Sequence, residues 1–258
     1  TGLWKFWFQP GRWVEYYPIH ETVLWVLLQL FGSDTLAYHL TSVLLHLLNA
    51  LLVWRLLAKF GLRFAWLGGL IFAVHPAQVE SVAWISELKN TLSLPFFLLA
   101  MGSWIDYEEH KQRRDYQWAL GLFLAGMLCK ITMAPFPVLI LLYAWWKRGR
   151  VEWRDLKASA PFFAISLVLG LVTLFCTYWF LQANEQPTYL VVIGGILSRI
   201  ALAGTSLAFY FAQCFWPVGQ MPIYPLWTVN PPTPIQFLPW PILAGILYVC
   251  WWKRKTWG

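Results

Sequence analysis

The feature that most constrains this chain is a succession of apolar stretches separated by short polar segments. They lie near 35–58, 64–75, 88–105, 116–129, 134–146, 160–181, 194–216 and 238–252. A helix of about 17–25 apolar residues can cross a bilayer. The segment 20–32 is only about half that length, so we expect it to lie along the membrane interface. The pattern predicts an all-α, polytopic transmembrane helix bundle with interfacial helices and ordered outer loops.

The composition is that of a membrane protein. Hydrophobic residues make up 59% of the chain and charged residues 12%, whereas a soluble domain carries about 25% charged residues. The 19 tryptophans suit the headgroup level of a bilayer. The net charge of +7 is divided among separate loops, which favours contact with anionic lipid and argues against a nucleic-acid partner. The four cysteines lie in apolar stretches without a C-x-x-C, so we expect them to be packing residues.

Basic clusters predict the orientation of the chain in the membrane. They follow alternate apolar stretches, at 55–63, 110–114 and 147–157, and cytoplasmic loops are rich in such residues. The cluster 253–255 lies on the same side only if 194–216 does not cross. We therefore expect 194–216 to be re-entrant or interfacial.

These considerations predict one transmembrane domain, 1–258, in four parts. The outer interfacial segment is 1–34, and the principal helix bundle is 35–181. The outer loop with the interfacial or re-entrant helix is 182–237, and the last span with its basic tail is 238–258. The stretch 215–225 is rich in proline, so we do not expect it to be helical throughout.

A polar segment at 75–90 interrupts the apolar pattern and is the first candidate for chemistry. Pro76 disfavours the helical conformation at His75 and suits the first turn of a new helix. On such a helix Glu80, Trp84 and Glu87 would share one face. A carboxylate beside an indole in a partly dry cleft is a candidate general base or cation ligand. The alternative is a helix terminus with an acidic first turn and a snorkelling Lys89.

A polar stripe marks one face of the stretch 35–58. It consists of Thr35, His39, Ser42, His46 and Asn49. In a bilayer this face must turn toward other helices or a wet cavity. We expect helix–helix hydrogen bonds from Ser42, His46 and Asn49, whereas His39, near the outer end, could reach a cavity. A zinc site is not indicated, because no third ligand has a matching spacing.

Two further groups of residues are candidates for substrate binding on the outer side. In the segment 12–21, aromatic residues such as Tyr16 and Tyr17 stand beside acids, which suits sugar recognition; the alternative is an aromatic belt. Lys89, Lys130 and Arg199 could hold a lipid-linked phosphate, or they could be snorkelling cations.

Several pieces of the sequence, in order, resemble one membrane family. They are His75-Pro76-x-x-x-Glu80-Ser81-Val82-Ala83-Trp84-Ile85-x-x-x-Lys89-Asn90, the segments Leu3–Gly11, Tyr16-Tyr17-Pro18 and Ala37–Ala50, and Lys130-Ile131-Thr132, Trp145–Gly149, Phe215-Trp216-Pro217 and Ile223-Tyr224-Pro225. They are similar to the transmembrane-and-tetratricopeptide O-mannosyltransferase-type proteins and their bacterial relatives. The 75–90 motif is the specific one, and the others support it.

The resemblance implies a GT-C-type membrane glycosyltransferase fold. It also implies that the chain crosses a bacterial inner membrane, or an equivalent endomembrane, several times. Such enzymes move a sugar from a polyprenyl- or dolichyl-phosphate-linked donor to a protein or glycan acceptor on the non-cytoplasmic face. In this fold the main catalytic acid follows the first span. We expect that span, its acidic residues and any tetratricopeptide repeats to lie outside the present chain, which leaves open whether this piece is catalytic by itself.

Together the residues and the resemblance give one set of site candidates. The catalytic candidates are His75, Glu80 and Glu87, and the substrate-binding candidates are Tyr16, Tyr17, His39, Trp84, Lys89, Asn90, Lys130 and Arg199. A divalent cation ordered by Glu80 and Glu87 stays open as a cofactor. Two rivals also stay open, a transporter or flippase for a lipid-linked substrate and a non-catalytic membrane scaffold, although no matching pair of glycine-broken apolar segments favours a transporter.

Overall fold

In the computed structural model, residues 2–9, 15–183, 194–221, 224 and 227–253 are described. All regular secondary structure in these ranges is helical, which confirms the prediction of an all-α protein. The chain divides into two compact units, Thr1–Gln186 and Pro187–Gly258, and each is described here by itself.

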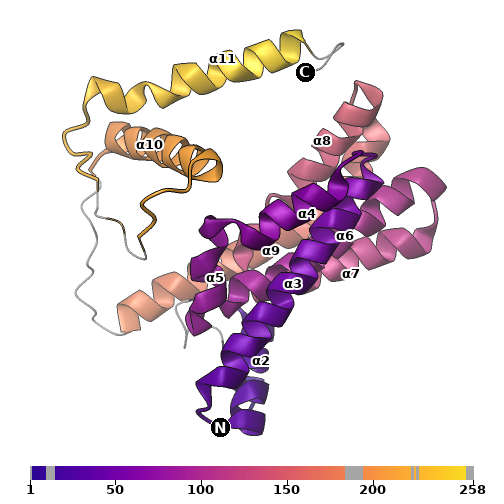
Figure 1. Cartoon of the computed structure of the whole chain (residues 1–258), viewed down its shortest axis with the longest axis vertical. Helices are drawn as coiled ribbons and strands as arrows, with labels where there is room; N and C mark the ends of the chain where they lie inside the picture. Colours follow the sequence, from indigo (N-terminus) through magenta and orange to yellow (C-terminus); the bar gives the residue numbers. More distant parts are fainter. Residues whose placement is uncertain (1, 10–14, 184–193, 222–223, 225–226, 254–258) are drawn as a thin grey trace. The chain divides into compact units, whose positions relative to one another are not determined.

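The first unit holds the longer series of helices (Figure 1). In chain order they are α1 Trp4–Phe8, α2 Pro18–Phe31, α3 Thr35–Lys59, α4 Ala65–Val74, η1 Pro76–Gln78, α5 Val79–Ala83, η2 Ile85–Glu87, α6 Leu88–His110, α7 Arg113–Cys129, η3 Ile131–Met133, α8 Phe136–Arg148 and α9 Trp153–Ala183. The second unit holds α10 Ile196–Phe215, η4 Pro234–Phe237 and α11 Pro239–Trp252. A helix therefore forms in each apolar stretch.

Local sequence signals set several helix ends. The Asp34 side chain caps α3, because its Oδ1 accepts a hydrogen bond from the Leu36 N–H at 3.0 Å. Gly149 ends α8 in the left-handed conformation, with φ 73°, which glycine adopts without steric cost. Lys111 ends α6 in the same region, with φ 54°, and α7 begins at Arg113. The resulting tight connection lets α6 and α7 pack against each other.

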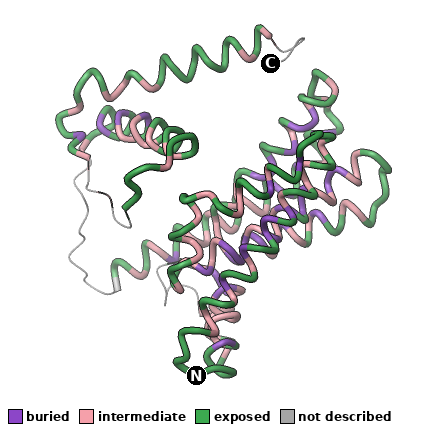
Figure 2. Tube along the Cα trace, viewed as in Figure 1, coloured by how far each residue is buried: buried purple, intermediate pink, exposed green. Residues whose placement is uncertain are grey.

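The core of the first unit is a cluster of buried aromatic and aliphatic side chains from α6, α7, α8 and α9; Figure 2 marks the buried positions along the chain trace. Trp104 and Phe162 meet edge to face with ring centroids 5.5 Å apart, and Phe123 stacks on Phe136 at 5.0 Å. All four side chains are at most 1% exposed. Aromatic pairs in such geometries add about 0.5–1.5 kcal/mol beyond the burial of their area. The cluster therefore holds four helices in one packing arrangement.

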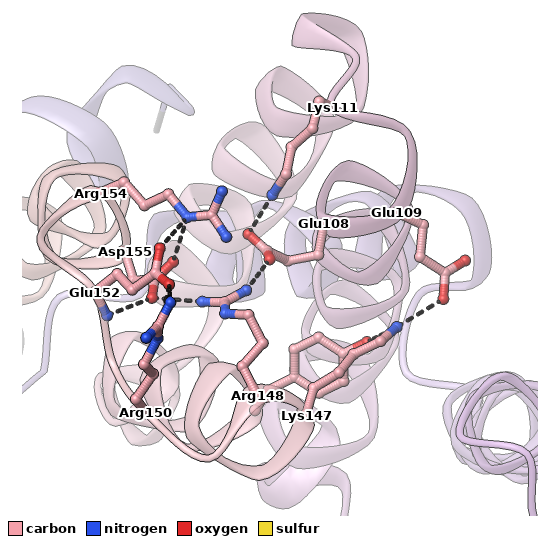
Figure 3. A network of polar contacts seen from close by, with 10 residues as sticks. Glu108, Glu109, Lys111, Lys147, Arg148, Arg150, Glu152, Arg154 and Asp155 are labelled. Atoms are coloured by element: carbon pink, nitrogen blue, oxygen red, sulfur yellow. Dashed lines mark hydrogen bonds and ion pairs between the residues drawn. The ribbon is translucent and has the colours of Figure 1, made fainter.

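A network of ion pairs joins the ends of three helices in the same unit (Figure 3). Arg148, at the end of α8, contacts Glu108 Oε2 of α6 at 2.6 Å and also pairs with Asp155 near the start of α9. Both carboxylates are almost fully buried, with side chains 7% and 4% exposed. Buried charges persist only when they are paired; Lys111 also contacts Glu108 and Arg154 lies 3.9 Å from Asp155, but Arg148 is the cation that pairs with both carboxylates and so joins the three helices.

Two residues of the polar stripe on α3, His46 and Asn49, make helix–helix contacts as predicted, whereas the hydrogen bond predicted for Ser42 is not formed among the described residues. Asn49 Nδ2 donates to the Thr91 carbonyl of α6 at 2.8 Å, and His46 Nε2 lies 3.0 Å from the Ala73 carbonyl of α4. Ser42 is buried, but its hydroxyl has no hydrogen-bond partner among the residues that the structure describes. The stripe thus fixes α3 between α4 and α6.

Three helices are long and apolar enough to cross a membrane: Thr35–Lys59, Trp153–Gln182 and Pro234–Trp252. These three helices support the conclusion that the chain is a membrane protein. The crossing of the remaining apolar helices, the interfacial or re-entrant position of α10 and the four-part division of the chain stay predictions. Helix α10 ends at Phe215, and the described part of the proline-rich stretch after it is not helical, as expected.

In the second unit, α10 and α11 pack closely at Gly204. A Cβ at this position would lie 2.7 Å from Trp240 Nε1, so glycine is required for the contact. Trp240 Nε1 in turn donates to the Ile200 carbonyl at 3.0 Å. An open apolar groove of about 460 Å³ lies along this pair of helices, with Leu207, Phe211 and Leu243 in its walls.

Candidate functional site

The polar segment 75–90 is not a single helix. It consists of η1, α5 and η2, and α6 begins at Leu88. Trp84 adopts an extended backbone, with φ −93° and ψ 123°, between α5 and η2. The predicted common helical face of Glu80, Trp84 and Glu87 is therefore wrong, since that spacing requires an unbroken helix. The extended conformation predicted for His75 before Pro76 is confirmed, with φ −68° and ψ 125°.

Asn90, in the first turn of α6, is the centre of a polar cluster. Its Nδ2 donates hydrogen bonds to Glu87 Oε2 at 2.7 Å and to Ser81 Oγ at 3.0 Å. Its Oδ1 accepts a hydrogen bond from Lys130 Nζ, forty residues further along the chain. An amide offers one acceptor oxygen and two N–H donors. Both ends of this amide are therefore engaged by protein groups.

Two carboxylates and two ammonium groups balance each other in this cluster. Lys89 Nζ lies 3.5 Å from Glu15 Oε2 and 3.6 Å from Glu87 Oε1, and Lys130 Nζ lies 3.9 Å from Glu87 Oε2. The side chains of Glu87, Lys89 and Lys130 are about one-fifth exposed, while that of Glu15 is 44% exposed. We call Glu15, Tyr17, Ser81, Glu87, Lys89, Asn90 and Lys130 the polar cluster.

Burial and charge set the protonation of two members of the polar cluster. Burial lowers the pKa of Lys130, the charge of Lys89 lowers it further, and the carboxylates of Glu87, Glu15 and Glu80 oppose both effects. Burial raises the pKa of Tyr17 to about 12, and the carboxylates of Glu15 and Glu87 act in the same direction. The Tyr17 hydroxyl therefore keeps its proton at neutral pH and can donate a hydrogen bond.

The helix ends bring these residues together. Lys130 leaves α7 with an extended backbone, φ −162° and ψ 133°, directly after the last helical residue. Gly126 of α7 faces α6, since a Cβ there would come into ordinary contact with Phe96 Cβ at 3.4 Å. Tyr17 precedes the first residue of α2, and Glu87 precedes that of α6. The polar cluster is thus built from three helix termini.

His39 and His75 lie in a different place from the polar cluster. They line a groove of about 310 Å³ between α3, the end of α4 and α5, together with His46, Gln78, Val79 and Val82. His75 Nδ1 accepts a hydrogen bond from the Ala77 N–H at 3.2 Å. In a neutral imidazole the proton then sits on Nε2. The first part of the polar segment 75–90 lines one side of this groove, whereas Glu80 and Glu87 are not among its lining residues.

The remaining predicted site residues have separate surroundings. Tyr16 donates its hydroxyl hydrogen bond to the Trp7 carbonyl at 3.0 Å. Glu80 and Trp84 are exposed on α5 and directly after it. Arg199 is exposed on α10 in the second unit. The positions 12–14 of the aromatic segment lie outside the described residues.

Two members of the polar cluster were not among the predicted site residues. Glu15 stands in the aromatic segment that the sequence singled out, and Ser81 belongs to the 75–90 motif. The signal was an acid between aromatic residues and a hydroxyl next to Glu80. Neither signal predicts that Glu15 contacts Lys89 or that Ser81 contacts Asn90, because both contacts depend on tertiary packing.

A metal site is not formed by the predicted acids among the described residues. Among the described residues, one group of three side chains has ligand atoms that converge: Asp106, Glu109 and His110, on the last turns of α6. Glu80, Glu87 and His75 do not converge in this way.

Comparison with known proteins gives the family. Residues 17–179 match the family model described as dolichyl-phosphate-mannose-protein mannosyltransferase. The chain belongs to this family. The match confirms the resemblance drawn from the sequence and identifies the chain as a membrane glycosyltransferase-family protein.

A curated relative agrees with the family match. The protein O-mannosyl-transferase Tmtc1 of Drosophila melanogaster is 34% identical over 109 residues. The aligned part is 39% of this chain and 12% of that relative, so the chain spans only a small part of its length. No solved structure matches the chain.

Proposed function

We propose that the protein transfers a sugar from a polyprenyl-phosphate-linked donor to a hydroxyl group of a protein or glycan acceptor on the non-cytoplasmic face of the membrane. The observation that carries this proposal is the polar cluster. It brings a carboxylate, Glu87, and an ammonium group, Lys130, within 3.9 Å of each other at the ends of helices in a membrane-protein family. Glycosyl transfer requires a base and a phosphate-binding cation in one place.

The two lysines are suited to the donor phosphate. In the structure each one has a carboxylate neighbour, and the four charges sum to zero. A lipid phosphate entering the cluster would take over part of this pairing from Glu87 and Glu15. Cations placed where negative charge develops stabilise the transition state of a departing phosphate.

Glu87 is the best-placed general base. In the reaction the acceptor oxygen attacks the anomeric carbon, and the bond from that carbon to the phosphate oxygen breaks. The acceptor proton passes to the carboxylate, and the electron pair of the broken bond leaves with the polyprenyl phosphate. Such a base contributes about 10²–10⁴-fold to the rate. The exposed Glu80 adds a further negative charge in the same polar segment.

The neighbouring aromatic residues and imidazoles provide surfaces for the two substrates. Tyr17 offers a protonated hydroxyl inside the polar cluster, and the exposed indole of Trp84 and the ring of Tyr16 can stack against a sugar. The groove beside His39 and His75 is open and mainly apolar, with these imidazoles and Gln78 among its few polar groups, and we assign it to the acceptor. Arg199, in the second unit, stays a predicted phosphate-binding residue.

The test is transfer of sugar by the full-length protein. Sealed right-side-out vesicles receive radiolabelled polyprenyl-phosphate mannose and an impermeant acceptor peptide mixture, and label in peptide is counted. We expect E87Q to reduce kcat at least 10²-fold, in line with a lost base. K130A should raise KM for the donor and also lower kcat.

Matched controls come from the opposite end of α6. Glu109 and Lys147 form an exposed pair at 3.1 Å, and E109Q and K147A remove the same charges without touching the polar cluster. They should keep wild-type transfer, since exposed ion pairs contribute about 0–1 kcal/mol. Wild-type transfer by E87Q and K130A would refute the site, and movement of the donor across the membrane without product would favour a transporter.

A further inference from the structure

A second polar site lies between α3 and α6, and it shares no residue with the polar cluster. A groove of about 190 Å³ is lined by one face of each helix. Its polar groups are Arg55, Lys59, Ser103 and Asp106, and its walls are Leu52, Leu56, Leu98 and Leu99. Gly102 lies between them and contributes no side chain. The site therefore combines cations with an aliphatic wall.

Arg55 is the charged residue of this groove that lacks a carboxylate partner among the described residues. Lys59 Nζ pairs with Asp106 Oδ2 and donates to the Gly102 carbonyl at 3.0 Å. Asp106 is thus already engaged, and the Arg55 guanidinium is left with an exposed face. Inside or near a bilayer an uncompensated cation is costly, so it takes an anion from its surroundings.

The position of Arg55 along α3 indicates which anion is within reach. The helix has 25 residues and at about 1.5 Å per residue is roughly 37 Å long. This exceeds the hydrocarbon thickness of about 30 Å. The last turn and a half, from Arg55 to Lys59, therefore lies near one membrane surface, where the long side chains of these two residues reach the lipid phosphates. Leu52, which precedes Arg55 by about one turn, lies deeper, at the level of the acyl chains.

We infer that this groove binds the phosphate of an anionic phospholipid, with Arg55 as the main contact and the leucine walls against the first part of an acyl chain. A zwitterionic lipid is less suitable, because the positive end of its headgroup would face a site that already has an excess positive charge. Guanidinium groups bind phosphate oxygens through two parallel N–H bonds. Ser103 supplies a further hydroxyl donor in the lining.

The experiment measures lipid that stays with the protein. The full-length protein is reconstituted in phosphatidylcholine with a minor fraction of phosphatidylglycerol, extracted in mild detergent, and its bound lipids are quantified by mass spectrometry. Wild type should retain phosphatidylglycerol in excess of its share in the bilayer. R55A and R55Q should each retain about fivefold less phosphatidylglycerol. This factor corresponds to the contribution of one cation at an anionic lipid surface, which is about 1 kcal/mol.

The matched control is Arg63, which is exposed after the same helix and lies over the Phe64 ring at 5.6 Å, outside the groove. R63A should retain as much phosphatidylglycerol as wild type. An equal loss in R63A and R55A would overturn the site in favour of diffuse surface attraction, as would undiminished retention in R55Q. Release of the lipid by millimolar inorganic phosphate would overturn the lipid as the occupant in favour of a free phosphate.

Discussion

At the residue scale, Asn90 determines how the polar cluster is organised. Its amide presents an N–H donor to Glu87 and an acceptor oxygen to Lys130, and any other side chain would change one or both of these contacts. The oxygen stabilises the ammonium form of Lys130 by accepting its hydrogen bond, while burial lowers the pKa of the same group. Asn90 thus links the proposed base to the proposed phosphate-binding cation.

Substitution of Asn90 should shift the titration of Lys130 in opposite directions. N90A removes the accepting oxygen, so the pKa of Lys130 should fall further. N90D places a carboxylate beside the ammonium group, so this pKa should rise. Competitive acetylation of Lys130 across a pH series, read by mass spectrometry, measures both shifts without any need for activity. Coincident labelling curves for wild type, N90A and N90D would disprove the link.

At the element scale, the junction of α6, α8 and α9 depends on Arg148. R148A should lower the free energy of unfolding by up to about 3–5 kcal/mol, because it removes the one cation that pairs with both buried carboxylates and leaves Glu108 with the exposed Lys111 and Asp155 with the more distant Arg154. R150A is the control, since Arg150 is 76% exposed and pairs with Glu152 at the surface; it should cost about 0–1 kcal/mol. Thermal unfolding of the purified protein in one detergent compares the two.

The origin of the R148A effect can be tested separately. The triple variant R148M, E108Q and D155N removes the buried charges together and should recover most of the stability, since the cost arises from unpaired carboxylates. If the triple variant is as unstable as R148A, the packing of the arginine stem, and not its charge, holds the junction together.

The apolar pattern was sufficient to predict the helices but not the breaks in the polar segment. Hydrophobic stretches predicted α3, α6, α7, α8 and α9 because their burial or exposure to lipid follows from composition. The extended Trp84 was not predictable in this way: residues 79–90 contain neither glycine nor proline, so no local signal ends the helix at Ala83. Similarly, the meeting of Lys130 with Asn90 depends on how α7 packs along α6.

At the scale of the whole molecule, the positive-inside pattern makes a prediction about topology. A reporter of cytoplasmic location fused at residue 258 should be active, because the last basic cluster and the clusters after α3, α6 and α8 would then lie on one side of the membrane. An external reporter would show that α10 crosses, contrary to the expected interfacial or re-entrant position.

The residues of the polar cluster are held in place by two different parts of the first unit. Glu87, Asn90 and Lys130 belong to the two neighbouring ends of α6 and α7, which pack against each other over their length, whereas Glu15 reaches Lys89 from a separate amino-terminal segment. Withdrawal of that segment would deprive Lys89 of one anion and leave the spacing between carboxylate, amide and second ammonium unchanged. An arriving anion would therefore compete with a replaceable neighbour while the rest of its binding site is already formed.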